Sequence, residues 1–342
     1  MYYSSLCIIL LSLIVHFFNA SAYYQDSLNT CHKAFIYKPG DYAVANTINI
    51  CSNADSIPIG YLANINMVVC DDKLCANVIL KICWDLAGNY ARFDTLPGKP
   101  LTKFDHKRFT EVDYKKLDNI LKDKNSMLRI LEKEELIDKN IILKANTVDA
   151  VTGATPKSIK NAVVEGAAYS SFVLWHFVNG SVKDSMRAYT LSIYSEQVAE
   201  QLLGSENFET QLFALKQMDD DYYKTHLPLL FGMIRKSVPL IKAYIIGKAP
   251  LPFSDQEQNQ EFVLHFSEFD SYSKSIFINR ITAEKNLATI FLPLMLPRLQ
   301  ILDKKQLDKY ISAYQKFEIP GYQELIKILS KESMPDKRWN QE

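Results

Sequence analysis

The sequence has no excess of either charge, since 39 Lys and Arg residues balance 39 Asp and Glu residues. Nucleic-acid binders usually carry a basic excess or stripe, so the composition gives no support for a polyanionic partner. Glycine is scarce, with 11 residues in 342, which argues against a fibrous or low-complexity protein. No phosphate-binding loop, dinucleotide fingerprint, His-Glu-x-x-His or Gly-x-Ser-x-Gly motif occurs. What remains is an ordinary globular composition, long enough for two domains.

Long hydrophobic runs are missing except at the N-terminus. Residues 6–18 are almost wholly apolar and are followed by the small residues Ala20-Ser-Ala22. This pattern predicts a signal peptide over residues 1–22, although no Lys or Arg precedes the apolar run. A short N-terminal anchor is the alternative. No second run approaches spanning length. We therefore expect an exported protein, periplasmic or extracellular, with no integral membrane span after signal removal.

The cysteines that follow the predicted signal peptide are odd in number: Cys31, Cys51, Cys70, Cys75 and Cys83. At least one is therefore a thiol or pairs with another chain. In an oxidising compartment we expect disulfides among the others. Cys70 and Cys75 flank a four-residue turn between two strand-like runs, so they form either a structural bridge or a redox-active pair. A zinc site needs a second close pair of ligands, and the sequence has none.

The first half of the chain has strand patterns followed by helical ones. Residues 23–58 look irregular, with Pro39-Gly40 as a turn signal. Residues 61–69 and 76–84 predict a β-hairpin, and residues 89–93 a third strand. Thr110 with Asp113 predicts a helix N-terminus with reciprocal capping. A further strand is expected over residues 189–194. Residues 59–195 thus predict an α+β domain with a small antiparallel sheet.

After residue 195 the strand patterns stop, and helical periodicity continues to about residue 331. Short amphipathic segments alternate with Gly and Pro breaks. Such segments, joined by short loops, predict an all-α domain over residues 196–331, either a HEAT-like helical repeat or an irregular bundle. Residues 332–342 form a polar tail.

One motif in the sequence indicates a chemical function. Asp149, Thr152, Gly153, Ala154 and Thr155 match the pattern Asp-x-x-Ser/Thr-Gly-Ala-Thr at all five specified positions. The motif resembles the acceptor site of the FMN-binding domain family, which includes the flavin-carrying G and C subunits of the Rnf and sodium-translocating quinone reductase complexes. The resemblance covers seven positions, and no second motif accompanies it.

The resemblance implies that an ApbE-like flavin transferase attaches FMN through its phosphate to Thr155. We expect Thr155 to cap a helix that begins at Pro156, because proline favours the first helical position. The free N–H groups and the dipole of that helix would then bind the phosphate. Lys157 adds positive charge where many relatives carry Ser or Thr. Asp149 would serve recognition by the transferase or order the turn.

Alternatives exist for the same residues. Thr-Gly-Ala-Thr-Pro is also a good loop-to-helix transition without any cofactor. Trp84, Tyr90 and Trp175 can stack on a flavin ring or belong to the core. Two functional hypotheses follow. The first is an exported flavoprotein in extracytoplasmic electron transfer with an unidentified redox partner. The second is a non-enzymatic cell-envelope protein whose helical-repeat domain binds a protein partner.

Overall fold

The computed structural model describes residues 30–38, 44–69, 77–103, 106–136 and 159–331. The chain divides into two compact units, residues 1–201 and residues 202–342. They are called unit 1 and unit 2 below, and each is described by itself. The predicted signal peptide and the polar tail both lie outside the described residues.

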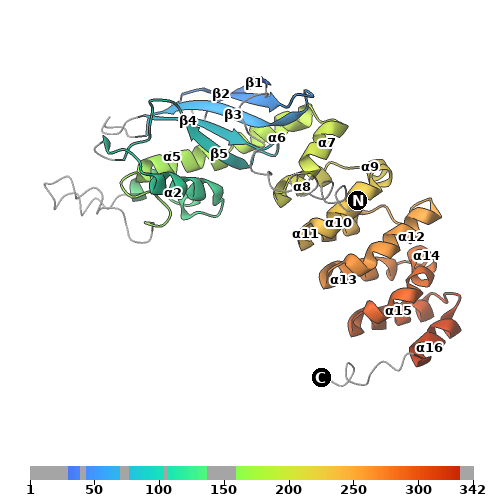
Figure 1. Cartoon of the computed structure of the whole chain (residues 1–342). Coiled ribbons are helices and arrows are strands. Elements are labelled where there is room, and N and C mark those ends of the chain that lie inside the picture. The colour runs from blue at the N-terminus through green and yellow to red at the C-terminus, as the bar shows by residue number, and fades with distance from the viewer. Residues whose placement is uncertain (1–29, 39–43, 70–76, 104–105, 137–158, 332–342) are drawn as a thin grey trace, which may run out of the picture. The chain divides into compact units, whose positions relative to one another are not determined.

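Unit 1 contains a five-stranded antiparallel sheet in which neighbouring strands are also neighbours in sequence (Figure 1). The strands are β1 (Thr30–Tyr37), β2 (Asn46–Ser52), β3 (Pro58–Met67), β4 (Val78–Trp84) and β5 (Tyr90–Thr95). The expected hairpin is confirmed as β3 and β4, with Leu62 opposite Cys83. This order makes β1 and β5 the two edge strands, so one side of β5 has no neighbouring strand in the sheet.

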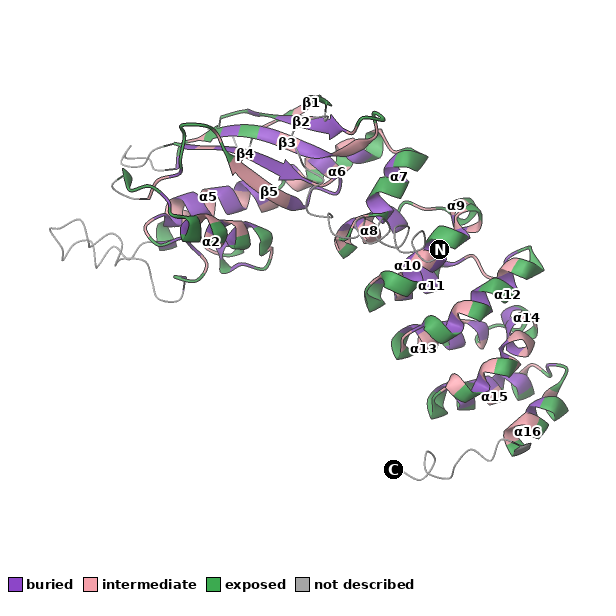
Figure 2. Cartoon of the chain, in the orientation of Figure 1, coloured by how far each residue is buried: buried purple, intermediate pink, exposed green. Residues whose placement is uncertain are grey.

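Alternation along the strands builds the core of unit 1. Ile50, Tyr61 and Trp84 face one another across β2, β3 and β4, and each is at least 99% buried. Figure 2 shows buried residues running along these central strands. Since side chains alternate between faces every second residue, one face of the sheet supplies this apolar layer.

Unit 1 also contains three helices that pack beside its sheet (Figure 1): α2 (Glu111–Lys122), α5 (Ala168–Asn179) and α6 (Val182–Ser192). Short 3-10 segments lie at Met127–Arg129 and Lys133–Leu136. Trp84 in β4 donates a hydrogen bond to the carbonyl of Val178 in α5, and Tyr61 in β3 donates to Met186 in α6. Aromatic side chains with one polar atom thus join the sheet to both helices.

Two expectations for unit 1 are wrong. Residues 23–58 are not irregular, because β1 and β2 lie within them and complete the sheet. Residues 189–194 are not a strand, because Tyr189 to Ser192 end helix α6. Its buried residues Val182, Met186 and Thr190 are spaced four apart, the helical period, which outweighs the local alternation.

Unit 2 is entirely helical in its described residues, following α7 (Glu196–Leu203), which spans the division between the units. The helices are α8 (Phe208–Leu215), α9 (Asp220–Thr225), α10 (Leu227–Lys236), α11 (Pro239–Lys248), α12 (Gln256–Leu264), α13 (Ser271–Ile281), α14 (Lys285–Met295), α15 (Lys304–Lys316) and α16 (Tyr322–Lys331), with 3-10 segments at His265–Glu268 and Leu296–Ile301 (η6). The predicted fold class, an α+β part followed by an all-α part, is confirmed.

Helices of unit 2 contact partners two places along the chain. Helix α11 contacts α13, α13 contacts α15, and α12 contacts α14. This arrangement in two rows is that of stacked helical hairpins. Aromatic rings fill the space between the rows. The ring of Phe277 contacts those of Phe262 and Phe291. Among the helices of the described residues, none has the length and apolar character that crossing a membrane requires.

Candidate functional site

The motif residues Asp149, Thr152, Gly153, Ala154 and Thr155, together with Lys157, lie outside the described residues, as do Cys70 and Cys75. The described chain resumes at Ile159, which is 2% exposed.

The sequence predicts a helix from Pro156 to Trp175, with Gly166 as a point that can divide it in two; the helix expected over residues 159–165 is wrong, and the division at Gly166 is confirmed. Residues 159–167 form turns, and α5 begins only at Ala168. The interruption has a local cause. Gly166 adopts φ +73°, a backbone conformation that a continuing helix excludes. Ser171 of α5 then accepts a hydrogen bond from the N–H of Val164 at 3.0 Å, which fixes the turn against the helix. The described residues that follow Thr155 therefore give no support for a helix dipole at that residue.

The segment that follows the motif packs on helix α2. Lys116 of α2 donates a hydrogen bond from Nζ to the carbonyl of Lys160 at 3.0 Å. Helix α2 begins at Thr110, where the predicted reciprocal cap is confirmed: Asp113 N–H donates to the Thr110 hydroxyl oxygen, and the Asp113 carboxylate accepts from Thr110 N–H. Through Lys116, the capped helix α2 therefore binds the chain at Lys160, a few residues after the motif.

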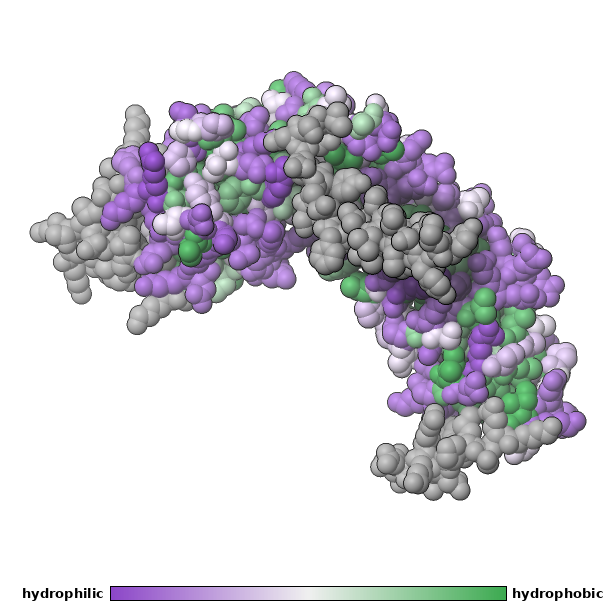
Figure 3. Space-filling view, in the orientation of Figure 1, coloured by the Kyte–Doolittle hydropathy of each residue, from purple (hydrophilic) through white to green (hydrophobic). Residues whose placement is uncertain are grey.

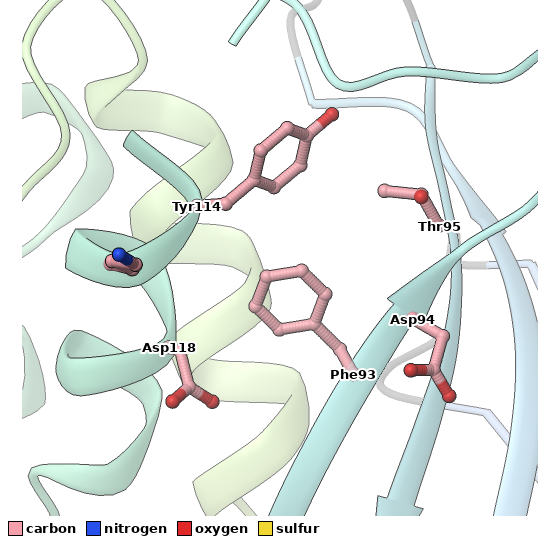
Figure 4. A pocket seen from close by; sticks show the side chains of 6 residues that line it. Phe93, Asp94, Thr95, Tyr114 and Asp118 are labelled. Carbon is pink, nitrogen blue, oxygen red and sulfur yellow. The ribbon is translucent and has the colours of Figure 1, made fainter. Parts of the chain in front are cut away.

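An open cleft of about 490 Å³ lies between β5 and α2, on the helix that contacts Lys160. Its lining residues are Phe93, Asp94 and Thr95 from β5 and Tyr114, Lys115 and Asp118 from α2. Figure 4 shows the rings of Phe93 and Tyr114 pointing toward each other across the cleft. Their centroids are 6.3 Å apart, with planes tilted by 42°. The volume is within the range of small-molecule sites, about 300–1,000 Å³.

Hydrogen bonds hold the walls of the cleft in place. The hydroxyl of Tyr114 accepts the N–H of Leu101 at 3.0 Å, which fixes its ring. The carboxylate of Asp118 accepts from the Tyr90 hydroxyl at 2.8 Å and from Lys122 Nζ at 2.6 Å. Burial raises the pKa of Tyr90, and its hydrogen bond to Asp118 raises that pKa further, so the phenol stays protonated as a donor.

The two carboxylates of the cleft are paired with cations. Asp118 pairs with Lys122, and Asp94 pairs with Arg92. Lys115 is exposed at the rim. The cleft therefore presents two aromatic faces and little net charge, which favours a planar, mostly uncharged ring system over a strongly charged ligand.

The six lining residues include no His, Cys or Ser, and neither carboxylate stands unpaired as a general base. Nucleophilic and general acid–base catalysis need such groups in reach of a substrate. The cleft is therefore suited to binding, and any redox reaction in it requires a cofactor.

Three aromatic residues considered as flavin contacts prove to be structural. Trp84 and Trp175 are 0% and 3% exposed, and their indole N–H groups donate to the carbonyls of Val178 and Asp123. Tyr90 supports the cleft through Asp118 without lining it. Phe93 and Tyr114 were not foreseen, because only the packing of α2 beside the edge strand brings residues 21 apart in sequence face to face.

Comparison of this chain with protein-family models, with curated proteins and with solved structures gives no match.

Proposed function

We propose that the protein is an exported flavoprotein that carries FMN covalently on Thr155 and acts in extracytoplasmic electron transfer. The motif Asp149-Ala-Val-Thr-Gly-Ala-Thr155 carries the proposal. An ApbE-like transferase would form the bond between the flavin phosphate and the threonine oxygen. When bound, FMN supplies one- and two-electron redox chemistry that protein side chains lack.

In this proposal the cleft between β5 and α2 would hold the isoalloxazine ring. Phe93 and Tyr114 offer aromatic faces for stacking, and Thr95 offers a hydroxyl to the polar edge of the ring. Lys116 Nζ lies 3.0 Å from the carbonyl of Lys160, shortly after the motif, and its positive charge, with that of Lys157, would attract the phosphate. In this proposal the side chains orient the flavin and exclude water from one of its faces.

Export is part of the proposal. The disulfide between Cys31 and Cys51 is compatible with an oxidising compartment, where such bonds persist. Covalent attachment suits that location, because a dissociated cofactor is lost outside the cytoplasm. The helical unit 2 would dock the electron-transfer partner, since stacked helices offer extended binding surfaces.

The visible absorption spectrum of the exported protein, co-expressed with a flavin transferase, tests attachment. A flavin spectrum that persists after denaturation and disappears in Thr155→Ala supports the proposal. If Thr155→Ala retains the same covalent flavin, attachment at Thr155 is wrong. If neither protein is coloured, the chain is better explained as an envelope protein whose helical unit binds a partner.

Flavin fluorescence tests the cleft separately. Stacking on aromatic rings quenches flavin emission, so Phe93→Leu should raise the emission of the attached flavin. Phe35→Leu is the matched control, because Phe35 is a half-buried aromatic residue of the same sheet that does not line the cleft. Equal emission from both variants would place the ring elsewhere, even if Thr155 carries it.

A further inference from the structure

The end of unit 2 leaves apolar surface uncovered. Helix α16 has an apolar stripe, but only Leu325 is fully buried; Ile328 and Leu329 are half-buried, and Ile326 is 40% exposed. Figure 3 shows apolar side chains gathered on the visible face of the helical unit near α14, α15 and α16. Among the described residues no helix follows α16 to cover this stripe, and stacked-helix proteins cover such faces with a capping element.

A groove of about 330 Å³ runs between η6 and α16. Five of its lining side chains are apolar: Pro293, Leu296, Pro297, Leu299 and Ile328. Glu324 is exposed and lines the same groove. The groove therefore fits a flat apolar side chain with positive charge beside it.

We propose that residues 332–342 fold back along α16 and place the indole of Trp339 in this groove. In the sequence Glu332-Ser-Met-Pro-Asp-Lys-Arg-Trp-Asn-Gln-Glu342, Trp339 is the only aromatic residue, and Lys337 and Arg338 precede it directly. The two cations lie beside Glu324, and the ring packs on the prolines and on Ile328. This inference concerns unit 2 alone and does not depend on the flavin.

The length of the tail permits this contact. Glu324 lies seven residues before the end of α16, about 10 Å back along the helix axis at 1.5 Å per residue. Trp339 follows Lys331 by eight residues, which span up to about 29 Å when extended. The tail therefore has enough residues for the reversal of direction. Pro335 disfavours a helix that continues through the tail.

Quenching of tryptophan fluorescence by acrylamide tests the proposal in the intact protein. The sequence has three tryptophans, and Trp84 and Trp175 are buried in unit 1. Any readily quenched emission therefore comes from Trp339. We expect little such emission in the wild type and a several-fold larger quenching constant in Ile328→Lys, which places a cation in the groove and repels Lys337 and Arg338. Trp339→Phe in the Ile328→Lys background should abolish that increase.

Ile326→Lys is the matched control, because it makes the same change on the same helix at an exposed position outside the groove. It should leave quenching unchanged. Circular dichroism checks that both variants keep their helices. Readily quenched Trp339 in the wild type overturns the proposal, as does equal quenching in the two lysine variants. Protection that disappears on dilution also overturns it, because the groove would then hold the tail of a second copy.

Discussion

The disulfide between Cys31 and Cys51 joins directly opposite residues of β1 and β2, at the end of the hairpin farthest from its connecting loop. Breaking it leaves edge strand β1 held by its hydrogen bonds to β2 and by contacts with α6 and the N-cap residue of that helix. These include the Tyr37–Ser181 hydrogen bond of 2.8 Å and the contact between Phe35 and Tyr189. Because β1 is mostly exposed, little apolar burial replaces the lost bond.

The magnitude follows from the 20-residue separation of the two cysteines. In the chain-entropy model, closing a loop of this length removes about 11 cal/mol/K from the unfolded chain, or about 3.3 kcal/mol at 25 °C. For a unit of about 200 residues, this corresponds to a fall in melting temperature of about 7–13 °C. Typical domains are stable by only about 5–15 kcal/mol, so the loss is large.

Denaturant unfolding followed by fluorescence measures this effect, since Trp84 and Trp175 both lie in the core of unit 1. The wild type is compared with and without reductant, beside Cys31→Ala/Cys51→Ala. The variant should be less stable than the oxidised wild type by about 3.3 kcal/mol, and reductant should destabilise the variant less than the wild type, because any bridge between Cys70 and Cys75 is reduced in both. A loss below about 1 kcal/mol in both would refute the reasoning, because closure of the loop would then contribute little.

Two further predictions concern named hydrogen bonds. Burial raises the pKa of Asp113, but hydrogen bonds from Lys103 and Thr110 outweigh it and hold that pKa below its ordinary value of about 4. The stability that ionised Asp113 contributes is therefore present above pH 4 and is lost as the pH falls through the folded-state pKa. The free energy of unfolding of Asp113→Asn should be lower than that of the wild type at pH 7, and the two should converge at low pH. Asn259, 3% exposed, accepts from Phe253 N–H at 2.9 Å and donates to its carbonyl at 2.8 Å. Asn259→Ala should cost unit 2 about 2–4 kcal/mol, measured by circular dichroism, because two buried backbone groups lose their partner; unchanged stability would show that water replaces the amide.

Local signals in the sequence were sufficient for much of the fold. The hairpin of β3 and β4 followed from two β-branched runs around a polar turn. Helix α2 followed from Thr110 and Asp113, which act within four residues of each other. The helices of unit 2 followed from periodicity and from breaks at Gly and Pro. Each of these signals is complete within a short window.

The features that the sequence does not predict depend on tertiary context. Strand β1 is mostly exposed and carries polar residues, so its sequence has no apolar alternation, and pairing with β2 defines it. Since neither strand was expected, the pairing of Cys31 with Cys51 was not expected either. The cleft was missed for the same reason, because Phe93 and Tyr114 meet only when α2 packs beside β5. The motif at Asp149–Thr155 is therefore visible in the sequence, whereas the cleft between β5 and α2 is not.

The central claim is that Thr155 bears a flavin phosphoester. Intact-mass measurement of the exported protein, produced with a flavin transferase, tests it most directly, followed by fragmentation of the peptide that contains residues 149–155. We expect one FMN, lost as a unit, on Thr155, and an unmodified mass for Thr155→Ala but not for Thr147→Ala, which lies outside the motif. An unmodified wild-type peptide under the same conditions, with a known acceptor protein fully modified alongside, would contradict it.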